Sequence, residues 1–451
     1  MTNPPTEMPL AAGARRPPVV GNVASLPLAS VDELSVHFQS KRGIVHAVDR
    51  VSFDIGDGER VGLVGETGCG KSVTARSFLG LVPSPPALHA GGRILFRPKQ
   101  DCTRCHGAGC ASCDRLGRAP VPCPACRGAG CGHCDGTGQE QHDLTRLTPR
   151  QMRRVRGEQV AMIFQDPALA LNPVLTIGQQ VAEVLHEHRA DVLLAEAGLT
   201  GQGALLQRAA RDRSTRLERA LLAAPGLRGQ RNRLQKVVRD HVARALAETR
   251  IANPRKIMDS YPHELSGGMK QRVMIAQALA CAPDLLIADE PTTALDVTIQ
   301  AHILDLIHEL QERHRTAVLY ISHDLSLVRD FCDRVVVMYA GQVAEEGPTS
   351  RLFQQPLHPY TRGLLAAVPT GGQPRGTLMA IDGTVPELAN PSSQCRFHTR
   401  CGHGNMVCAS QTPVLTVHDP PNHRAACFLY DDGEALGLRA EDMPSTDRSV
   451  S

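Results

Sequence analysis

Apolar and polar residues alternate from Val31 to Ile55, in segments such as VDELSVHF and VSFDI. This period of two predicts half-buried antiparallel strands. The segment RVGLVG, residues 60–65, predicts a short buried strand that ends in glycine, and a helical pattern follows from Lys71. Farther along, DLLIADE, TAVLYISHD and RVVVMY have a strand–helix–strand rhythm, which predicts a largely parallel sheet. The expected fold class is therefore α/β.

Two further segments have helical patterns. LTPRQMRRVRG predicts a helix with Thr148 as its N-cap and Pro149 at its first position. The stretch from about Asp191 to Arg244 is rich in leucine, alanine and basic residues, and predicts helices interrupted near Pro225–Gly226. Such a basic helical pattern is typical of a solvated face, and a basic contact surface is the alternative.

Length and charge narrow the class of protein. A chain of 451 residues is long enough for two or three domains and a large core. Its formal charge of +3 does not by itself imply a polyanionic partner. No apolar run approaches the ~18 residues of a membrane helix, and the Pro-rich start lacks the apolar core of a secretory signal. A cytosolic location is expected, where paired CxxC motifs indicate metal ligands rather than disulfides.

A phosphate-binding loop is predicted by GETGCGKS, which fits G-x-x-x-x-G-K-[ST] between a predicted strand and a predicted helix. Its glycines let backbone N–H groups converge on phosphate oxygens, and the helix N-terminus adds positive potential. We expect Lys71 to reach the β- and γ-phosphates of ATP, and Ser72 to offer its hydroxyl to Mg²⁺. The predicted nucleotide-binding residues of this loop are Gly65, Glu66, Thr67, Gly68, Cys69, Gly70, Lys71 and Ser72.

Two carboxylates end the apolar segment LLIADE. They stand at the C-terminal end of a predicted strand, where ligands bind in open α/β sheets. We expect Asp289 to hold Mg²⁺, directly or through water, and Glu290 to orient and polarise the attacking water. Phosphoryl transfer requires little more from a protein than such positioning and charge neutralisation.

Further segments, in the expected order, resemble the motifs of ABC ATPases. LSGGMKQR resembles the signature segment, FQDP the glutamine loop, ALD (Ala294 to Asp296) the D-loop and ISHD the switch histidine. The resemblance implies that Gln165 senses Mg²⁺ and couples closure to a partner, and that His323 contacts the γ-phosphate and positions Glu290. The predicted Mg²⁺ ligands are Ser72, Gln165 and Asp289, and the predicted catalytic residues are Glu290, His323, Gln165 and Lys71.

The same resemblance implies that two ATPase domains close head to tail around two nucleotides. Ser266, Gly267 and Gly268 open a helix, so their N–H groups are expected to cap the γ-phosphate of ATP held by the other subunit. Hydrolysis removes the phosphate that bridges the two domains, and the pair reopens. With identical subunits the arrangement is isologous.

Two positions depart from the family pattern. Met269 occupies the fifth position of the signature, where many members carry glutamine, and we expect tolerance because the backbone makes most of the contacts. No adenine-stacking aromatic residue is obvious upstream of the phosphate loop. By spacing it would fall near Arg42, with Phe38 and His46 nearby, so its identity stays open.

Within the family, the chain resembles ATP-binding subunits of dipeptide/oligopeptide importers. The segments MIFQDPALALNPVLTIGQQ, YPHELSGGMKQRVMIAQAL and LLIADEPTTALDVTIQA carry the resemblance, as does PLHPYTRGLLAAVP near the C-terminus. It implies a peripheral subunit at the cytoplasmic face of the inner (cell) membrane. The implied partners are two membrane-spanning permeases, a second ATPase subunit (a paralogue or a copy of itself) and an extracytoplasmic solute-binding protein; no nucleic acid is expected.

Four cysteines near the C-terminus have the spacing C-x₅-C-x₆-C-x₁₈-C. This spacing supports a four-thiolate site for zinc or an iron–sulfur cluster. The resemblance favours a [4Fe–4S] cluster, because importer ATPases carry one in this region. The predicted ligands are Cys395, Cys401, Cys408 and Cys427.

Eight more cysteines form four CxxC pairs spaced like zinc knuckles, and the segments CHGAGC and CRGAGC supply glycines for tight turns around a metal. Eight thiolates suit two tetrahedral Zn²⁺ ions. Each half could bind one ion, or the outer and inner pairs could each share one. Saturated Cys₄ zinc leaves no open position for water, so we expect a structural module, with partner contact and metal or redox sensing as alternatives. The predicted ligands are Cys102, Cys105, Cys110, Cys113, Cys123, Cys126, Cys131 and Cys134.

The predicted fold is a P-loop ABC-type nucleotide-binding domain with a mixed, mostly parallel sheet, an antiparallel subdomain and a helical signature subdomain, extended by a Cys-rich insertion and a small C-terminal metal-binding extension. The expected segments are a disordered tail at 1–30, the ATPase domain at 31–345, the eight-cysteine insertion at 99–140, a basic helical insertion at 191–240, the C-terminal extension at 346–430 and a polar tail at 431–451.

Two other classes of function are weighed against an importer ATPase. Soluble DNA-repair ATPases of the excision type also insert glycine-rich zinc modules into ABC domains, but they carry two ATPase halves and bind nucleic acid strongly. This chain has one phosphate loop and one signature segment. A regulatory module that holds ATP without turnover is the other alternative. The transported solute is not predicted by the sequence, because such a subunit never touches it.

Overall fold

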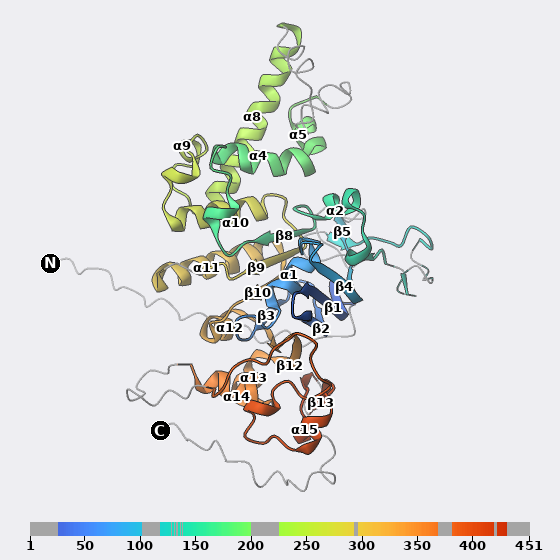
Figure 1. The fold of residues 1–451 in the computed structure, drawn as a ribbon. Helices are drawn as coiled ribbons and strands as arrows, with labels where there is room; N and C mark the ends of the chain where they lie inside the picture. The colour runs from blue at the N-terminus through green and yellow to red at the C-terminus, as the bar shows by residue number, and fades with distance from the viewer. Residues whose placement is uncertain are drawn as a thin grey trace, which may run out of the picture.

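Two β-sheets and a group of helices form the body of the protein in a computed structural model (Figure 1). The structure describes residues 26–101, 118–199 apart from 128, 130, 132, 133, 136 and 138, and then 225–292, 296–368, 381–418 and 422–430. Of the expected tails, residues 1–25 and 431–451 lie outside the described residues. Four of the insertion's cysteines also lie outside them: Cys102, Cys105, Cys110 and Cys113.

The main sheet has eight strands in the order β13-β14-β12-β11-β3-β10-β9-β8. The pairings from β8 through β9, β10 and β3 to β11 are parallel, and those from β11 to β13 are antiparallel. β9 and β10 are buried at every position, as continuous apolar strands in a parallel sheet should be. The strands are β3 (Arg60–Val64), β8 (Val160–Ile163), β9 (Leu285–Asp289), β10 (Ala317–Ile321), β11 (Arg334–Tyr339), β12 (Gln342–Pro348), β13 (Thr416–His418) and β14 (His423–Ala425).

A second, antiparallel sheet has the order β2-β1-β4-β7. Its two long strands confirm the predicted half-buried antiparallel strands, since the partly buried β1 and β2 pair along most of their length, with register shifts between Val31 and His37. A small two-stranded sheet of β5 and β6 flanks residues 102–117, and the cysteines of the insertion's second half follow β6. The strands are β1 (Ala29–Ser40), β2 (Gly43–Ile55), β4 (Ala87–Phe96), β5 (Lys99–Asp101), β6 (Arg118–Pro120) and β7 (His142–Asp143).

Helices cover the main sheet and form a separate lobe above it in Figure 1. Thr148 caps its helix with a complete capping box and Pro149 stands at the first position, which confirms the prediction. The helices are α1 (Lys71–Phe78), α2 (Pro149–Val155), α3 (Pro167–Ala170), α4 (Ile177–His188), α5 (Ala190–Glu196), α8 (Pro225–Glu248), α9 (Pro254–Ile257), α10 (Gly267–Leu279), α11 (Val297–His314), α12 (Leu325–Phe331), α13 (Thr349–Gln354), α14 (Pro359–Ala366) and α15 (Met406–Ser410), with 3₁₀ turns η2 (Leu144–Arg146), η3 (Pro262–Glu264), η4 (His398–Arg400) and η5 (Phe428–Tyr430).

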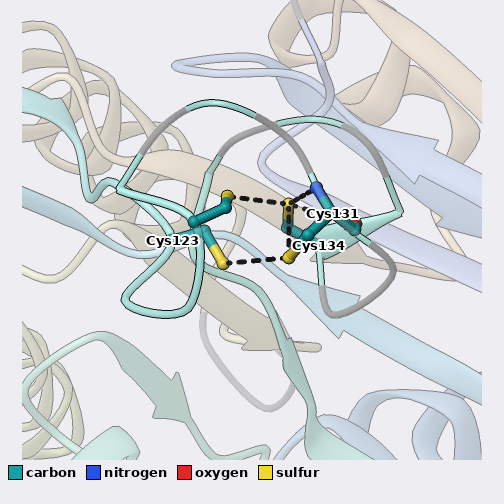
Figure 2. A group of neighbouring side chains, drawn as sticks. Cys123, Cys131 and Cys134 are labelled. Atoms are coloured by element: carbon teal, nitrogen blue, oxygen red, sulfur yellow. Dashed lines mark hydrogen bonds between the residues drawn. The ribbon is translucent and has the colours of Figure 1, made fainter.

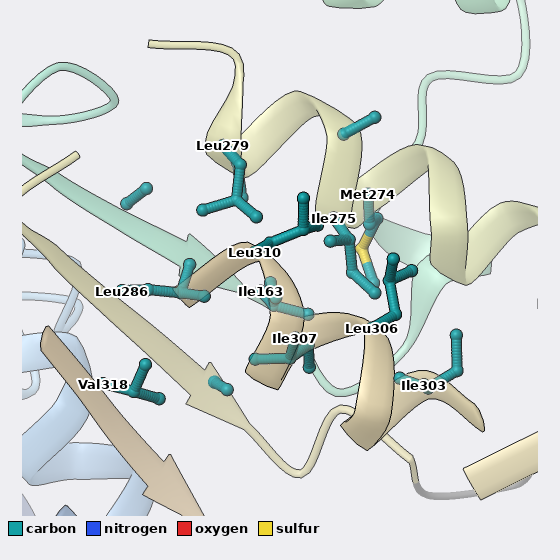
Figure 3. Close-up of a cluster of buried hydrophobic side chains, with 14 of the residues drawn as sticks. Ile163, Met274, Ile275, Leu279, Leu286, Ile303, Leu306, Ile307, Leu310 and Val318 are labelled. Atoms are coloured by element: carbon teal, nitrogen blue, oxygen red, sulfur yellow. The ribbon is translucent and has the colours of Figure 1, made fainter. Parts of the chain in front are cut away.

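One hydrophobic core joins the signature helix to the sheet. Side chains of α10 and α11 meet those of β8, β9 and β10 in this core (Figure 3). The residues that α11 contributes recur at helical spacing and are buried: Ile303, Leu306, Ile307 and Leu310. Because α10 is packed in this way, the start of the signature segment has a fixed place relative to the strand that carries Asp289.

The basic helical segment has an apolar face as well. Pro225, where an interruption was expected, is the first residue of α8. Every fourth residue of α8 from Leu234 to Leu246 is buried in the same core. Arg239, on the outer side, pairs with Asp259 at 3.2 Å. The described part of this segment is thus a packed helix with a solvated basic face, and residues 200–224 lie outside the described residues.

The C-terminal extension is joined to the main sheet through β14, which pairs with β12. Glu345 of β12 is fully buried and accepts hydrogen bonds from the backbone N–H groups of Leu357 and His358, both at 2.8 Å. Its Oε1 also lies 2.7 Å from Nε2 of His423 on β14. One buried carboxylate therefore ties two distant parts of the extension to the ATPase sheet.

Candidate active site

The predicted phosphate loop connects β3 to α1. Two of its glycines are required by the fold: Gly65 has φ 148° and Gly70 has φ 102°. A Cβ atom at Gly65 would lie 2.1 Å from the carbonyl oxygen of Met338, and one at Gly70 would lie 2.4 Å from that of Ala47. The loop is thus pressed between β11 and β2, with backbone conformations at both positions that only glycine adopts easily.

Lys71 and Ser72 are the first two residues of α1. Lys71 contacts the phosphate loop, and Ser72 contacts the predicted Mg²⁺ ligand Asp289. The Lys71 ammonium group is buried and donates to the carbonyl oxygens of Gly65, at 2.7 Å, and Glu66, at 3.0 Å. Ser72 Oγ donates to Asp289 Oδ1 at 3.0 Å. A hydroxyl next to a carboxylate is a pair of hard oxygen ligands that suits Mg²⁺. Burial raises the pKa of Asp289, partly offset by the Ser72 hydrogen bond.

Three predicted catalytic side chains meet at the C-terminal ends of adjacent parallel strands. Gln165, two residues beyond β8, donates from Nε2 to Glu290 Oε2 at 3.0 Å. Nδ1 of His323, two residues beyond β10, lies 3.4 Å from the same oxygen. Glu290 directly follows β9 and has φ 48°, a left-handed conformation uncommon for a residue with a side chain. The structure thus brings the amide, the imidazole and the carboxylate together.

The signature residues are placed at the start of a helix, α10. Ser266 is the N-cap of α10, and its Oγ accepts a hydrogen bond from the N–H of Met269 at 3.3 Å. Gly267 and Gly268 form the first turn. No hydrogen bond or ion pair between described residues joins Ser266 to the phosphate loop of the same chain. Asp296 is the N-cap of α11, while Ala294 of the expected D-loop lies outside the described residues.

The adenine-stacking residue is not fixed by these contacts. Arg42 is 85% exposed at the turn between β1 and β2. Phe38 packs partly buried against the core, opposite Val45. His46 stacks on His37 with ring centroids 3.8 Å apart.

The second half of the cysteine insertion forms a compact group of four thiols (Figure 2). The Sγ atoms of Cys123 and Cys131 are 3.9 Å apart, those of Cys126 and Cys134 are 3.7 Å apart, and those of Cys131 and Cys134 are 3.8 Å apart. Four sulfurs at about 2.3 Å from one Zn²⁺ lie about 3.8 Å from one another. The four thiols therefore have the spacing of a single tetrahedral zinc site.

A buried ion pair anchors the insertion to the ATPase domain. Arg118 Nη1 lies 2.6 Å from Oδ1 of Asp284, whose side chain is 1% exposed. Asp284 Oδ2 also accepts from the backbone N–H of Lys99 at 3.3 Å. Burial raises the pKa of Asp284 to about 6, although Arg118 counters this shift. The anchor is at the N-terminal end of β9, whereas Asp289 and Glu290 are at its other end, so the insertion is remote from the catalytic cluster.

The four C-terminal cysteines surround one pocket, together with His358 and Phe397 among others. Their spacing is wider than that of the insertion's thiols, because no three of these four Sγ atoms, all in described residues, lie within 4.8 Å of one another. Burial raises the pKa of the Cys395 thiol to about 11 and that of Cys427 to about 12. The four predicted ligands are Cys395, Cys401, Cys408 and Cys427.

Motif analysis missed two residues that contact the phosphate loop. The Tyr360 hydroxyl accepts a hydrogen bond from the N–H of Glu66 at 2.8 Å, and Arg400 pairs with the Glu66 carboxylate. Both belong to the C-terminal extension. Tyr360 lies in the segment PLHPYTRGLL, which the sequence analysis used only as a family resemblance.

The loop and the strand-end carboxylates define the site of a P-loop ATPase, and comparisons with known proteins identify its family. The ABC transporter family matches residues 48–116 and 132–293, and the family described as "Oligopeptide/dipeptide transporter, C-terminal region" matches residues 344–408. The chain belongs to the ABC transporter family and is an ABC-type ATPase.

Individual relatives cover nearly the whole chain. A probable peptide ABC transporter ATP-binding protein, y4tR, of Sinorhizobium fredii is 40% identical over 90% of this chain and 96% of its own length. The dipeptide transport ATP-binding protein DppD of Bacillus subtilis is 38% identical over 89% of this chain and 94% of its own length. Among solved structures, the dimeric post-hydrolysis state of the ATP-binding cassette MJ0796 bound to ADP and Pi matches with a TM-score of 0.44 at 20% identity, over 71% of this chain and 98% of that one.

None of the described helices combines the length and the apolar character needed to cross a membrane.

Proposed function

We propose that this ATPase powers an importer of peptides or related small solutes. The observation that carries the proposal is the C-terminal extension, which matches the oligopeptide/dipeptide transporter region and is built into the ATPase sheet through β14. The names of the relatives as peptide and dipeptide transport proteins support the same cargo class.

The geometry supports a division of labour for hydrolysis. Lys71 binds the β- and γ-phosphates of ATP, while Ser72, Asp289 and Gln165 hold Mg²⁺, which neutralises phosphate charge when bound. Glu290 accepts the hydrogen bond of the attacking water and orients it. Gln165 and His323 fix the Glu290 carboxylate, because both contact its Oε2 atom in the structure.

Closure of two subunits completes the site in this proposal. The signature residues are held at the start of α10, and Ser266 makes no hydrogen bond to its own phosphate loop among the described residues. Their N–H groups are therefore available to cap the γ-phosphate on a facing subunit, and Asp296 lies at the same face in the proposed assembly. Loss of the γ-phosphate on hydrolysis removes the bridge and reopens the pair.

The permease partners are proposed to dock beside Gln165. Two large apolar side chains that follow Gln165 in the chain are strongly exposed, Leu169 of α3 at 86% and Val174 at 74%. Exposed apolar residues next to a catalytic glutamine provide a route by which a membrane partner senses the nucleotide.

The proposed location is the cytoplasmic face of the inner membrane, with two permeases, a second ATPase subunit and an extracytoplasmic solute-binding protein. The proposed domain boundaries are those expected from the sequence.

The insertion is proposed to hold structural zinc. The support is the thiol spacing of 3.7–3.9 Å at Cys123, Cys126, Cys131 and Cys134, which matches one tetrahedral ion. This favours pairing within each half of the insertion over pairing between the halves. The other four cysteines are proposed to hold the second Zn²⁺.

The C-terminal pocket is proposed to hold a [4Fe–4S] cluster. Its four sulfurs line a common space but are too far apart to meet at one zinc ion, and a cubane cluster separates its cysteine ligands more widely. The raised thiol pKa values mean that metal binding must displace protons.

Uptake of labelled dipeptide tests the proposed cargo. Cells that express the complete transporter with this chain should accumulate the dipeptide, and cells with the Glu290→Gln variant should not, at equal protein levels. Equal uptake by both strains would exclude peptide import as the work of this ATPase.

A further inference from the structure

The C-terminal extension contacts the phosphate loop at the second residue of the loop, Glu66. Arg400 Nη1 donates to Glu66 Oε2 at 2.8 Å, and Nη2 donates to Oε1 at 3.0 Å. The Arg400 side chain is 5% exposed and that of Glu66 is 26% exposed, so the guanidinium side of this bidentate pair is shielded from water. Such a fork fixes the plane and direction of the carboxylate, which a lysine cannot do.

Arg400 is held by contacts besides those to Glu66. Its remaining N–H groups donate to the Tyr339 hydroxyl at 3.2 Å, the Asp382 carbonyl at 2.9 Å and the Ile381 carbonyl at 3.2 Å. All five donors of the guanidinium group therefore have acceptors. The group also lies 5.7 Å from the ring centre of Tyr339, which adds a cation–π contact.

The backbone of Glu66 is held at the same time. Its N–H donates to the hydroxyl of the fully buried Tyr360 at 2.8 Å, and its carbonyl oxygen accepts from Lys71 Nζ at 3.0 Å. Glu66 is thus the point where the C-terminal extension and the phosphate-binding lysine meet. A shift of Glu66 would move one of the two carbonyl groups that hold Lys71.

We propose that Arg400 is a positioning residue of the nucleotide site, which acts through Glu66 to keep the phosphate loop in its ATP-receiving shape. Arg400 itself contacts no nucleotide in this account. The inference rests on the nucleotide site of the ABC ATPase and is independent of the cargo. A residue that only fastened the extension would affect stability without changing nucleotide affinity.

The dissociation constant of MgATP, measured by calorimetry on the isolated full-length chain, tests the proposal. Arg400→Gln and Glu66→Gln should each weaken binding about tenfold, which corresponds to about 1.4 kcal/mol. The matched control is Arg362→Gln. Arg362 is in the same extension and donates to Pro356 O and Tyr430 Oη, both at 2.9 Å. This control should change the constant by less than about twofold.

The double variant Arg400→Gln/Glu66→Gln separates positioning from a general loss of structure. Residues that act as one unit should give a double variant about as weak as either single one, whereas multiplied losses would contradict action through Glu66. Wild-type affinity in a folded Arg400→Gln variant would overturn the proposal.

If Arg400→Gln fails to fold, Arg400→Lys is the alternative variant, because it keeps the positive charge and loses the bidentate pair of hydrogen bonds to Glu66. The proposal then predicts faster hydrogen exchange at residues 65–72 and weaker MgATP binding, and unchanged exchange with unchanged affinity would overturn it. Failure of the wild-type chain to bind MgATP is a different result, because it would contradict the nucleotide site itself rather than the role of Arg400.

Discussion

Gln165 Nε2 donates a hydrogen bond of 3.0 Å to Oε2 of Glu290, 125 residues farther along the chain. The contact exists because β8 and β9 are parallel neighbours, so their C-terminal ends lie side by side. His323 reaches the same carboxylate from the end of β10. The sheet therefore brings three loops together, and the side chains of Gln165 and His323 set the direction of the Glu290 carboxylate.

Removal of either neighbour should slow hydrolysis more than it weakens binding. Gln165→Ala and His323→Ala leave the phosphate loop intact but release the Glu290 carboxylate, so we expect ATP turnover in the assembled transporter to fall about 10- to 100-fold. The MgATP dissociation constant should change by less than about threefold for His323→Ala and by more for Gln165→Ala, which also loses a proposed Mg²⁺ ligand. The reverse pattern, with weak binding and normal turnover at saturating ATP, would contradict the assigned roles.

Asp284 should make the stability of the chain depend on pH. Its pKa is raised from 3.8 to about 6 by burial, so between these values the folded state binds more protons than the unfolded state. The free energy of unfolding should therefore fall as pH rises through this window, by about 3 kcal/mol in total.

The Asp284→Asn variant is the control, because it lacks this titration and keeps the other titrating groups. The melting temperature of the wild-type chain relative to Asp284→Asn should decline from about pH 4 to about pH 6 and level off above it. A difference that is independent of pH would mean that the pKa of Asp284 is the same in the folded and unfolded states, with Arg118 fully offsetting burial.

Zinc content tests the assignment of the insertion. Cys126→Ser should lower the zinc of anaerobically purified protein by about one ion per chain, because a tetrahedral site that loses a thiolate binds zinc weakly. Cys332→Ala, a buried cysteine outside both groups, should leave the content unchanged. Wild-type protein without zinc would contradict the assignment.

The C-terminal centre should be visible and should affect the nucleotide site. Anaerobic wild-type protein is expected to be brown with broad absorption near ~400 nm, and Cys408→Ser should lose this colour. Arg400 directly precedes the ligand Cys401, so an empty pocket should loosen its grip on Glu66 and weaken MgATP binding severalfold. Colourless protein with full zinc occupancy at these cysteines would favour a zinc site instead.

Local motifs predicted the residues of the nucleotide site. The phosphate loop, Asp289 and Glu290 were predicted because each needs particular residue types next to a strand end, and such patterns are local in sequence. The placement of Gln165 and His323 followed from the family resemblance, and the structure brings both to Glu290.

Contacts between distant segments were not predicted. Arg400 and Glu66 are 334 residues apart, and Arg118 and Asp284 are also far apart in sequence. No local periodicity marks such a pair, because the partners are selected by tertiary packing. The pairing of the insertion's cysteines was likewise open in the sequence, since spacing alone fits either arrangement, and the thiol distances favour one.

Phosphate release by the assembled transporter, measured for the wild type and Glu290→Gln at saturating MgATP, is the most direct test of this chain as the motor of the transporter. The account predicts that the variant still binds MgATP but releases phosphate at least about a hundredfold more slowly, since water is no longer polarised by a carboxylate. Equal rates of release would contradict it.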